Sequence, residues 1–397
     1  MCKCKYMRVS LLTGGGTTHY VLGLLSGLTS NNINVDLIGN NELMDSDIAR
    51  SENVNFHNLR GDQNPHASMK EKVIRVLKYY LKLLRYAKIT DSKLFHIQWL
   101  NKFIYFDRTF LNIYYKILGK KIIFTAHNIN AGERDRDDTL LNRLTLKFMY
   151  NIVDHVIVHT NKMKFQLIED YRIKDSKVTV IPHGILNIVP KSELTCRQAK
   201  QKLQLENYEK IILFFGYIAP YKGLDTLILS LVNLREKYKD MKLIVAGEVR
   251  KNCESYWEAI QKIALKNNLT DRILNKIEFI PDNEIEIYFK AADVLILPYV
   301  SIFQSGVPFL AYYFGLPVIA TDVGSLREDV VEGETGFICK PEDPDDLANK
   351  VDLFYQSDLY RNLEIKRNEI IEYANEKYSW GKIGKKTHAV YERVSSL

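Results

Sequence analysis

Residues 214–223 read Phe-Phe-Gly-Tyr-Ile-Ala-Pro-Tyr-Lys-Gly, and they join an apolar run that starts at Ile211 to a helical pattern over residues 224–234. A strand that turns through glycine into a helix is typical of an α/β sheet. The backbone N–H groups at such a helix start carry partial positive charge, and Lys222 adds a full charge. This stretch therefore predicts a site for a phosphorylated ligand, with Gly216 and Lys222 in contact with it.

A second segment of the same kind lies further along the chain. Residues 304–307, Gln-Ser-Gly-Val, follow the apolar run Val294–Leu297 and lead towards Gly315-Leu316-Pro317-Val318-Ile319-Ala320. We expect a helix to begin there, so that the amides of Ser305, Gly306 and Val307 bind the same ligand. Arg250 is a candidate second cation, with ordinary surface exposure as an equal alternative. Ile280, at the end of a strand expected over 276–280, completes this set.

Short apolar runs alternate with longer amphipathic stretches along the whole chain, which predicts parallel sheets covered by helices on both faces. A polar stretch near residues 188–196 separates two series of runs. We therefore expect two tandem Rossmann-like domains, residues 1–186 and 187–377, with a hinge near residue 187. Strands are expected over 7–12, 35–38, 94–98, 121–126, 155–160 and 178–182, and then over 211–215, 242–246, 276–280, 294–297, 317–320 and 336–339. An aromatic anchor at 378–380 leads into a C-terminal helix that could pack on either domain.

The composition is that of a globular protein of two domains, and the charge is uneven. The 397 residues exceed one ordinary doubly wound core. Residues 1–186 hold 27 Lys and Arg against 17 Asp and Glu, so the first domain is the one expected to meet something anionic. No apolar run approaches a membrane span or a secretory signal, which favours a cytoplasmic protein. Neither a nucleic-acid partner nor a cofactor is expected.

The first predicted strand ends at a glycine-rich loop. Gly14-Gly15-Gly16 precedes a helical pattern over 20–28, with Thr17 or Thr18 able to cap it. Glycines let a ligand approach backbone amides without obstruction by a Cβ atom. The spacing matches neither the G-x-G-x-x-G fingerprint nor the P-loop. We expect Gly15 and Gly16 to contact a ligand, although a purely structural turn is the alternative.

Two histidines follow predicted strands of the first domain. His127 comes directly after the strand over 121–126, where an imidazole can bond a sugar hydroxyl or support developing charge. Asn128 follows it at the same edge. His183 lies in Ile181-Pro182-His183-Gly184, and a role in turning the chain is at least as plausible there as ligand contact.

No pattern in the chain favours a metal site. The loop over 132–138 is rich in Asp and Glu, but alternating arginines compete for those carboxylates, and we retain only Glu133 as a candidate contact of a second substrate. The five cysteines are scattered, apart from Cys2 and Cys4, whose spacing is a weak half-motif for zinc. Reduced thiols and a site without metal are the simplest interpretation.

Residues 69–88 predict an amphipathic helix with a basic face. One face carries Lys72, Arg75, Lys78, Lys82 and Arg85, and the opposite face carries Val73, Leu77, Tyr80, Leu84 and Ala87. Such a helix could lie on anionic lipid, with Tyr79 and Tyr86 at the headgroups. A crossover helix packed on the sheet fits the same periodicity. The positive charge of the domain favours peripheral contact with an anionic membrane.

Taken together and in order, these segments resemble glycosyltransferase family 4, the retaining enzymes of the GT-B fold. The resemblance covers almost the whole chain, from the first glycine loop through Thr125-Ala126-His127-Asn128, Val180-Ile181-Pro182-His183-Gly184, Gly216–Gly223, Ala291-Ala292-Asp293-Val294 and Gly315–Gly324. It implies two Rossmann-like doubly wound domains that face a central cleft, with a C-terminal helix that crosses back to the first domain. The first domain, with residues 378–397, is then the acceptor domain and the second is the donor domain.

The chain departs from the family pattern at two places. Tyr217 and Ala219 stand where relatives have an arginine beside the lysine, which leaves Lys222 alone. The two glutamates usual in the second segment are absent, and their places fall at Ile302 and Leu310. The sequence Gln304–Val307 resembles a branch of the family that carries Gln-Ser-Gly-Val instead.

The resemblance implies a metal-independent transferase that moves a sugar from a UDP- or GDP-linked donor to a glycan or lipid-linked glycan acceptor at the inner membrane face. His127 and Lys222 would be catalytic. Gly15, Gly16, Gly216, Arg250, Ile280 and Ser305–Val307 would bind the donor with Lys222, and Asn128, Glu133 and His183 would lie on the acceptor side. A non-catalytic partner of another transferase and a nucleotide-sugar epimerase are the alternatives.

Overall fold

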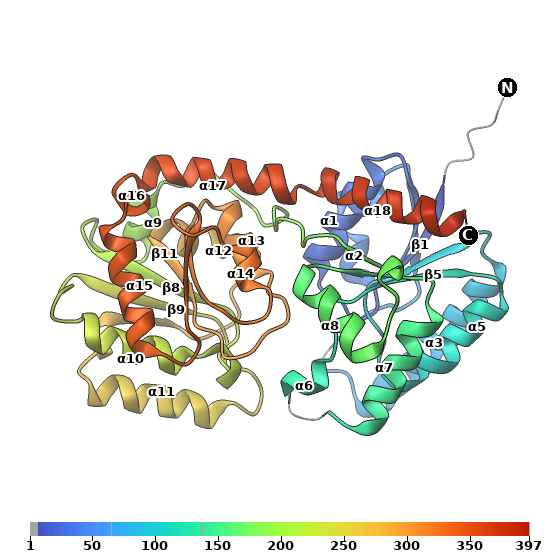
Figure 1. The fold of residues 1–397 in the computed structure, drawn as a ribbon, viewed down its shortest axis with the longest axis horizontal. Coiled ribbons are helices and arrows are strands. Elements are labelled where there is room, and N and C mark those ends of the chain that lie inside the picture. The colour runs from blue at the N-terminus through green and yellow to red at the C-terminus, as the bar shows by residue number, and fades with distance from the viewer. Residues whose placement is uncertain (1–6, 65, 136–137, 397) are drawn as a thin grey trace. The chain divides into compact units, whose positions relative to one another are not determined.

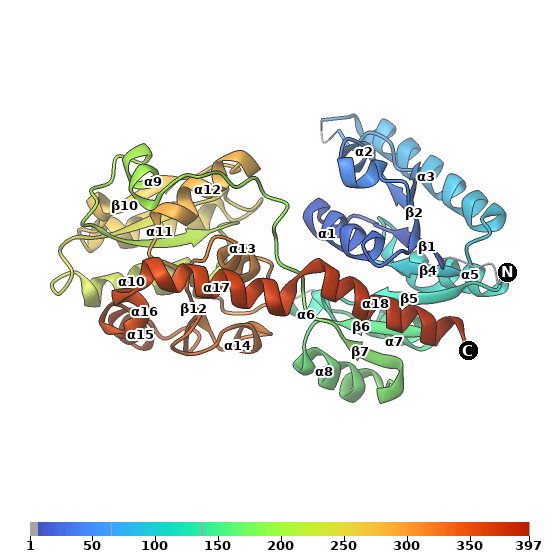
Figure 2. The ribbon, with the colours of Figure 1, turned by 90° about the horizontal axis from the view of Figure 1, so that it is seen from above.

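The computed structural model describes residues 7–64, 66–135 and 138–396. The chain divides into two compact units, Met1–Gly184 with Tyr378–Leu397, and Ile185–Lys377. Each unit is built on one parallel sheet with helices on both faces (Figures 1 and 2). This is the α/β architecture that the alternating pattern predicts, and each unit is described by itself below.

The first unit contains a seven-stranded parallel sheet in the order β3-β2-β1-β4-β5-β6-β7. Its strands are buried on both faces, which explains their nearly continuous apolar sequences. They are β1 Arg8–Leu12, β2 Asn34–Gly39, β3 Val54–Asn58, β4 Leu94–Ile97, β5 Lys121–Thr125, β6 His155–Val158 and β7 Val178–Val180. The helices are α1 Thr18–Thr29, α2 Asn41–Met44, α3 Met69–Ile89, α4 Ile104–Phe106, α5 Asn112–Ile117, α6 Ala131–Asp135, α7 Leu140–Ile152, α8 Asn161–Tyr171 and α18 Trp380–Ser395.

The second unit contains a six-stranded parallel sheet in the order β10-β9-β8-β11-β12-β13. Its strands are β8 Lys210–Phe215, β9 Met241–Ala246, β10 Ile273–Lys276, β11 Val294–Leu297, β12 Val318–Thr321 and β13 Gly336–Cys339. The helices are α9 Cys196–Lys202, α10 Leu224–Leu234, α11 Glu254–Lys266, α12 Asp282–Ala291, α13 Val307–Tyr313, α14 Leu326–Asp329, α15 Pro344–Gln356, α16 Asp358–Arg361 and α17 Leu363–Tyr378. Both sheets reverse their strand order once, at β1/β4 and at β8/β11.

The last helix, α18, belongs to the first unit and lies along α1 (red and blue in Figure 1). The contact depends on glycines. A Cβ atom on Gly27 would lie 2.2 Å from the Trp380 carbonyl oxygen, and one on Gly384 would lie 2.0 Å from the Gly27 carbonyl oxygen. The Trp380 indole fills the space above Gly23, where a Cβ would lie 2.0 Å from the ring. Only hydrogen side chains allow the two helix backbones to approach this closely.

Three details differ from the sequence-based expectations. The strand expected over 276–280 is β10 at Ile273–Lys276, so residues 277–280 form the loop after it. The strand β3, Val54–Asn58, was not predicted, because its polar residues hide the alternation. Thr17 occupies the N-cap position of α1 but makes no capping hydrogen bond through its side chain.

The helix α3 was predicted correctly in extent, but its tyrosines were not. Tyr79 and Tyr86 are buried, and they do not face a headgroup region. The hydroxyl of Tyr79 donates to Asn101 at 2.7 Å, and that of Tyr86 donates to Asp36 at 3.0 Å. The tyrosines of α3 therefore pack towards the sheet. Val73 and Leu77, which were expected on the packed face of the helix, are half exposed.

Candidate active site

Two of the predicted site segments, the glycine loop and the turn that carries Lys222, lie at the points where the strand order reverses. At such a point the connections that follow two adjacent strands lead to opposite sides of the sheet. This leaves a crevice beyond the carboxyl ends of the strands, and ligands of doubly wound sheets bind there. In the first unit, the glycine loop follows β1 and Trp99 follows β4. In the second unit, Gly216 to Lys222 follows β8 and Tyr299 follows β11. The topology thus gives each unit one place where a ligand fits best.

The glycine loop of the first unit is shaped by Trp99. A Cβ on Gly14 would lie 2.1 Å from the Trp99 carbonyl oxygen, and one on Gly16 would lie 1.9 Å from its indole ring. Gly14 also has a φ of +54°, in the left-handed region that favours glycine. By contrast, a Cβ on Gly15 would meet nothing within 4 Å. Gly14 and Gly16 are therefore required for packing, and Gly15 is the residue whose backbone a ligand can approach.

His127 lies against Trp99 at the same edge of the sheet. The two rings stack with centroids 3.8 Å apart and an interplanar angle of 4°. The ring of Tyr20 meets His127 edge-on at 4.6 Å, and it also touches His159 and His183. Three histidines from the ends of β5, β6 and β7 therefore converge on one tyrosine of α1.

A chain of hydrogen bonds fixes the tautomers of this cluster. The carbonyl of Ile181 can only accept, so Nδ1–H of His159 donates to it at 3.0 Å. In a neutral ring, Nε2 of His159 then accepts from Nδ1–H of His127, also at 3.0 Å. Nε2 of His127 is left as an acceptor, and it is buried without a hydrogen-bond partner among the described residues. An unpaired buried acceptor is costly unless a ligand satisfies it.

Burial keeps these histidines neutral. It lowers the pKa of His159 to about 4 and that of His183 to about 3. Burial, reinforced by the nearby His159 and His183, lowers the pKa of His127 well below its ordinary value. At neutral pH, His127 is therefore a hydrogen-bond acceptor rather than a cation.

The predicted acceptor-side residues fall in different surroundings. His183 is buried, belongs to the Tyr20 cluster and bonds the Gly184 carbonyl through Nδ1 at 2.7 Å. Asn128 directly follows His127 and is half-buried. Glu133 is exposed on the short helix α6. Residues 136 and 137 of the charged loop, like Cys2 and Cys4, lie outside the described residues.

Lys222 is the central residue of the second unit's site. Its ammonium donates to the Tyr299 hydroxyl at 2.7 Å and lies 3.9 Å from the centroid of that ring. Both side chains are buried, and they come from opposite sides of the β8/β11 reversal. The turn that carries Lys222 depends on Gly223, which has a φ of +65° and where a Cβ would lie 1.9 Å from the Pro298 carbonyl oxygen. A charged group is thus held rigidly beyond the carboxyl ends of the strands.

Gly216 stands at the opening of the same turn. Its φ is +109°, and a Cβ there would meet nothing within 4 Å. The neighbouring Gly247 packs its Cα onto the Gly216 carbonyl, where a Cβ would lie only 2.1 Å from the oxygen. As with Gly15, the glycine that faces open space is the one at which a ligand can approach the backbone.

The segment Gln304–Val307 lies beside Lys222 and Tyr299. The Ser305 hydroxyl is 3.5 Å from the Tyr299 hydroxyl, and it accepts the Val307 N–H at 3.3 Å. Gln304 reaches Asp329 at 3.4 Å, and burial raises the pKa of this carboxyl to about 8. Gln304 therefore bonds inwards to a neutral acid, and Ser305 is the member of the segment nearest to Lys222. Its bond to Val307 takes up one of the three amides expected to bind a ligand.

The two remaining predicted donor-site residues occupy loops after neighbouring strands. Arg250 follows β9, and its guanidinium lies 5.6 Å from the centroid of the Tyr221 ring. Ile280 is buried in the loop after β10, and not at the end of a strand as expected. Ile302 and Leu310, at the places of the usual glutamates, are both apolar, and Leu310 is buried in α13.

Sequence reasoning missed three residues that build the two sites. Trp99, Tyr299 and His159 each follow a buried strand within two residues, as His127 does. Position alone could have identified them, because the carboxyl ends of all parallel strands meet at one edge. Within the described residues, no group of three or more His, Cys, Asp or Glu side chains could hold a metal ion. No helix in the described ranges is long and apolar enough to cross a membrane.

Two family models match the chain, one over each half. The model described as glycosyl transferases group 1 matches residues 197–377, and the model described as Glycosyltransferase Family 4 matches residues 14–185. Among curated proteins, the D-inositol 3-phosphate glycosyltransferase of Corynebacterium aurimucosum is 22% identical over 289 residues, which cover 70% of this chain and 67% of that protein. Its counterpart in Corynebacterium efficiens is 24% identical, and the match covers 58% of this chain and 57% of that protein.

Solved structures agree in fold over nearly the full length. Sucrose-phosphate synthase from Thermosynechococcus elongatus has a TM-score of 0.75 at 19% identity and covers 98% of this chain and 99% of its own. Anabaena HepE in complex with UDP and glucose has a TM-score of 0.73, also at 19% identity, and covers 99% of this chain and 100% of its own. With two Rossmann-like sheets, both family models matched and a last helix that packs on α1, this chain is a glycosyltransferase of the group 1 and family 4 class with the GT-B fold.

Proposed function

We propose that this enzyme transfers a sugar from a UDP- or GDP-linked donor to a glycan or lipid-linked glycan, as a step in polysaccharide or glycoconjugate assembly. The observation that carries the proposal is Lys222, buried and held by Tyr299 at the strand-order reversal of the second unit. A fixed ammonium next to open backbone at Gly216 suits a diphosphate. Anabaena HepE, which shares the fold, holds UDP and glucose, and this supports a uridine donor.

In this proposal the second unit holds the donor and the first unit holds the acceptor. Lys222 stabilises the charge that develops on the diphosphate as the bond between it and the sugar C1 breaks. The acceptor oxygen forms its bond to C1 on the same face, and its proton passes to the departing diphosphate. Nε2 of His127 accepts a hydrogen bond from a sugar hydroxyl, which would satisfy its buried lone pair.

The test is release of nucleotide by the purified protein. UDP- and GDP-sugars are supplied with a panel of glycan and lipid-linked acceptors, and free nucleotide is measured. Release that requires an acceptor supports the proposal, whereas conversion of the donor without an acceptor points to an epimerase. Silence across the panel, combined with tight binding to another transferase, points to a non-catalytic partner.

We also propose that the first unit contacts the inner face of an anionic membrane. Along α3, the exposed residues Met69, Val73, Leu77 and Leu81 recur every fourth residue, and Lys78, Lys82 and Arg85 lie beside them. An apolar band next to a basic band is the pattern of an interfacial helix. The neighbouring α5 is joined to α3 by the bond from Tyr114 to the Leu84 carbonyl, and Arg108, in the segment just before α5, bonds Asn142 of α7.

Those neighbours extend the apolar surface. Phe110, Ile117, Leu140, Leu141 and Leu144 are all more than half exposed. Sedimentation with vesicles of phosphatidylcholine and phosphatidylglycerol tests this contact. Leu77→Glu with Leu81→Glu should abolish sedimentation, and Leu265→Glu, on an equally exposed leucine of the second unit, should leave it unchanged.

A further inference from the structure

A small cationic pocket lies at the carboxyl edge of the first unit's sheet, apart from the histidine cluster. Three segments form it: the loop after β3, the first half of α3, and the loop after β4. Its volume is about 300 Å³. Arg60, Lys72, Arg75 and Lys102 line it, and no carboxylate does so among the residues that the structure describes. Four cations that line one pocket repel each other unless an anion joins them.

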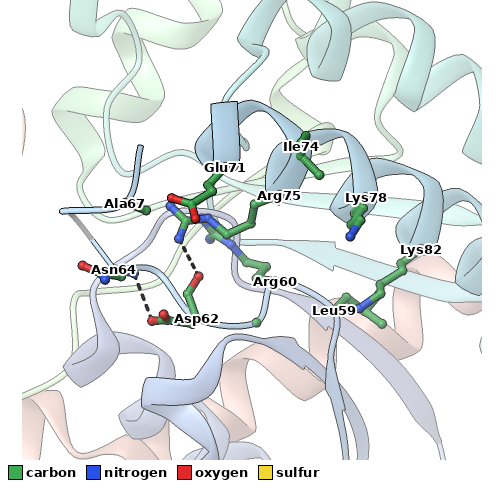
Figure 3. A pocket seen from close by; sticks show the side chains of 11 residues that line it. Leu59, Arg60, Asp62, Asn64, Ala67, Glu71, Ile74, Arg75, Lys78 and Lys82 are labelled. Carbon is green, nitrogen blue, oxygen red and sulfur yellow. Dashed lines mark hydrogen bonds between the residues drawn. The ribbon is translucent and has the colours of Figure 1, made fainter. Parts of the chain in front are cut away.

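A second pocket adjoins the first and has the same sign (Figure 3). Its volume is about 480 Å³, it shares Arg60 and Arg75 with the first, and it adds Lys78 and Lys82. Its two carboxylates are occupied locally: Glu71 accepts the Ser68 N–H at 2.8 Å, and Asp62 accepts the Asn64 N–H at 3.0 Å. The positive field therefore extends along α3. It is least offset by negative charge in the first pocket, which no carboxylate lines among the described residues.

The walls of the first pocket are held in place by internal bonds. The Tyr79 hydroxyl donates to Oδ1 of Asn101 at 2.7 Å, and the Asn101 N–H donates to the buried Asp107 at 2.5 Å. The Tyr80 hydroxyl donates to the other oxygen of Asp107 at 2.9 Å. With Oδ1 of Asn101 occupied, its amide presents N–H donors, which also suit an anion.

Two of the cations, Arg75 and Arg60, are held by a backbone carbonyl and by an aromatic ring, respectively. The guanidinium of Arg75 donates to the Asp62 carbonyl at 2.8 Å, and that of Arg60 lies 5.7 Å from the centroid of the Tyr79 ring. An arginine held by a backbone carbonyl or by an aromatic ring keeps its remaining donors available in a fixed geometry.

The pocket adjoins the region where the reaction is proposed to occur. Asn101 and Lys102 belong to the same loop as Trp99, which stacks on His127 at 3.8 Å. A ligand group in the pocket is therefore held two or three residues along the chain from the His127 site. Both lie at the carboxyl edge of one sheet and within one unit.

We propose that Arg60, Lys72, Arg75 and Lys102 bind a phosphate or pyrophosphate group of the glycosyl acceptor. The inference rests on the proposed function, because it treats the first unit as the acceptor unit. It adds the chemical class of the acceptor, which carries a phosphate next to the hydroxyl that receives the sugar. The phosphate can belong to a soluble sugar phosphate or to a lipid carrier, since the recognition chemistry is the same.

The test titrates inorganic pyrophosphate into the full-length protein by calorimetry. UDP is present at saturation, so that the diphosphate site of the second unit is filled, and the titration is repeated with Lys222→Ala. Arg75→Gln and Lys102→Gln should each raise the Kd for pyrophosphate about tenfold, and the double variant should raise it about a hundredfold. Arg75→Lys should recover part of the loss, and the Kd should rise with salt.

Lys88→Gln is the matched control, because Lys88 is an exposed lysine of α3 that lines neither pocket. It should leave the Kd unchanged, and all variants should keep the wild-type Tm. An equal effect of Lys88→Gln, an unchanged Kd in the double variant, or no pyrophosphate binding at millimolar concentration would each overturn the inference. Loss of UDP binding with pyrophosphate binding intact would count against the proposed donor site alone.

Vesicles distinguish the two sources of phosphate. Phosphatidylcholine vesicles that contain a polyprenyl phosphate are compared with vesicles that contain phosphatidylglycerol at equal charge, in the wild type and in Arg75→Gln with Lys102→Gln. A wild-type preference for the polyprenyl phosphate that the double variant loses supports a lipid carrier. Pyrophosphate binding without that preference supports a soluble acceptor. Equal binding to both kinds of vesicle, without pyrophosphate binding, would overturn the phosphate pocket and indicate a general membrane-binding surface instead.

Discussion

Lys222 is the side chain on which the proposed chemistry depends most, because it is the cation placed at the reversal of the second sheet. We expect Lys222→Ala to lower kcat/KM at least a hundredfold without unfolding the protein, since the developing charge on the diphosphate loses its buried partner. Steady-state rates of nucleotide release measure this effect. Lys239→Ala, on an exposed lysine of the same unit, should keep wild-type rates. Wild-type rates in Lys222→Ala would remove Lys222 from the phosphate role.

His127 acts in this scheme through its lone pair and not through its charge. His127→Phe keeps a ring to stack on Trp99 but removes both ring nitrogens, so we expect kcat/KM to fall by about 10- to 100-fold. The Tm should fall as well, because Nε2 of the buried His159 loses the hydrogen bond that it accepts from His127. Burial holds the His127 pKa well below 6.5, so His127 should not titrate near that pH. The wild type and His127→Phe should therefore have pH–rate profiles of the same shape around pH 6.5. An inflection lost on substitution would show that His127 titrates during turnover.

For single residues, the sequence predicted where a site residue lies better than it predicted which side chains contact it. His127 and Lys222 could be placed at strand ends from the apolar runs before them, but Trp99 and Tyr299, which hold them, could not. A stacked ring and a hydroxyl partner come from other strands of the sheet, and a single sequence carries no information about which strands are neighbours. Gln304 shows the same limit, because its bond to the neutral Asp329 crosses from one loop to another.

Among the elements, α18 gives the sharpest prediction about stability. Gly27→Ala should destabilise the first unit by about 2 kcal/mol or more, because its Cβ would overlap the Trp380 carbonyl. Gly381→Ala lies in α18 itself, and a Cβ there would meet nothing within 4 Å. This control should be neutral or stabilising by up to about 1 kcal/mol, since alanine favours a helix over glycine. Urea unfolding followed by tryptophan fluorescence measures both, and equal stability in the two variants would contradict the packing argument.

Elements with uniform apolar sequences were the easiest to predict. The strand Val294–Leu297 and the helix Leu224–Leu234 have the bounds expected from periodicity alone. The strand β10 was misplaced because Phe279 and Ile280, in the loop after it, are as apolar as the strand itself. Tyr79 and Tyr86 were misassigned because a long amphipathic tyrosine can serve either a core or an interface, and only the bonds to Asn101 and Asp36 decide between them.

For the molecule as a whole, the buried histidines predict sensitivity to acid. His183 has a folded pKa of about 3, against an ordinary value of 6.5, so between these values the unfolded chain binds more protons than the folded one. Stability therefore falls as the pH drops below 6.5, by about 1.4 kcal/mol per pH unit for each such histidine. We expect His183→Asn to reduce this slope by about that amount between pH 6 and pH 4.5, as measured by urea unfolding. His66→Asn, at an exposed site, should not change the slope.

Donor binding should also stabilise the whole chain. If UDP binds only the folded protein, a concentration one hundred times its Kd adds about 2.7 kcal/mol and raises the Tm. A thermal-shift series with UDP, GDP and their sugars, in the wild type and in Lys222→Ala, would identify the base. No shift with any of these nucleotides would contradict a nucleotide-sugar donor. The fold class itself was predicted from the alternation of strands and helices, and the confirmed contact between α18 and α1 came from the family resemblance and not from periodicity.

The placement of α18 has a consequence for biosynthesis. Residues 378–397 emerge from the ribosome after the entire second unit, yet Trp380 and Tyr391 complete the core of the first, where the Tyr391 hydroxyl contacts His96 at 2.5 Å. Until α18 has been made, the nascent first unit has an uncovered groove along α1, and His96 lacks its contact with Tyr391. We expect the second unit to mature first, although it is made later, and the first unit to become protease-resistant only once α18 has left the ribosome and packed on α1.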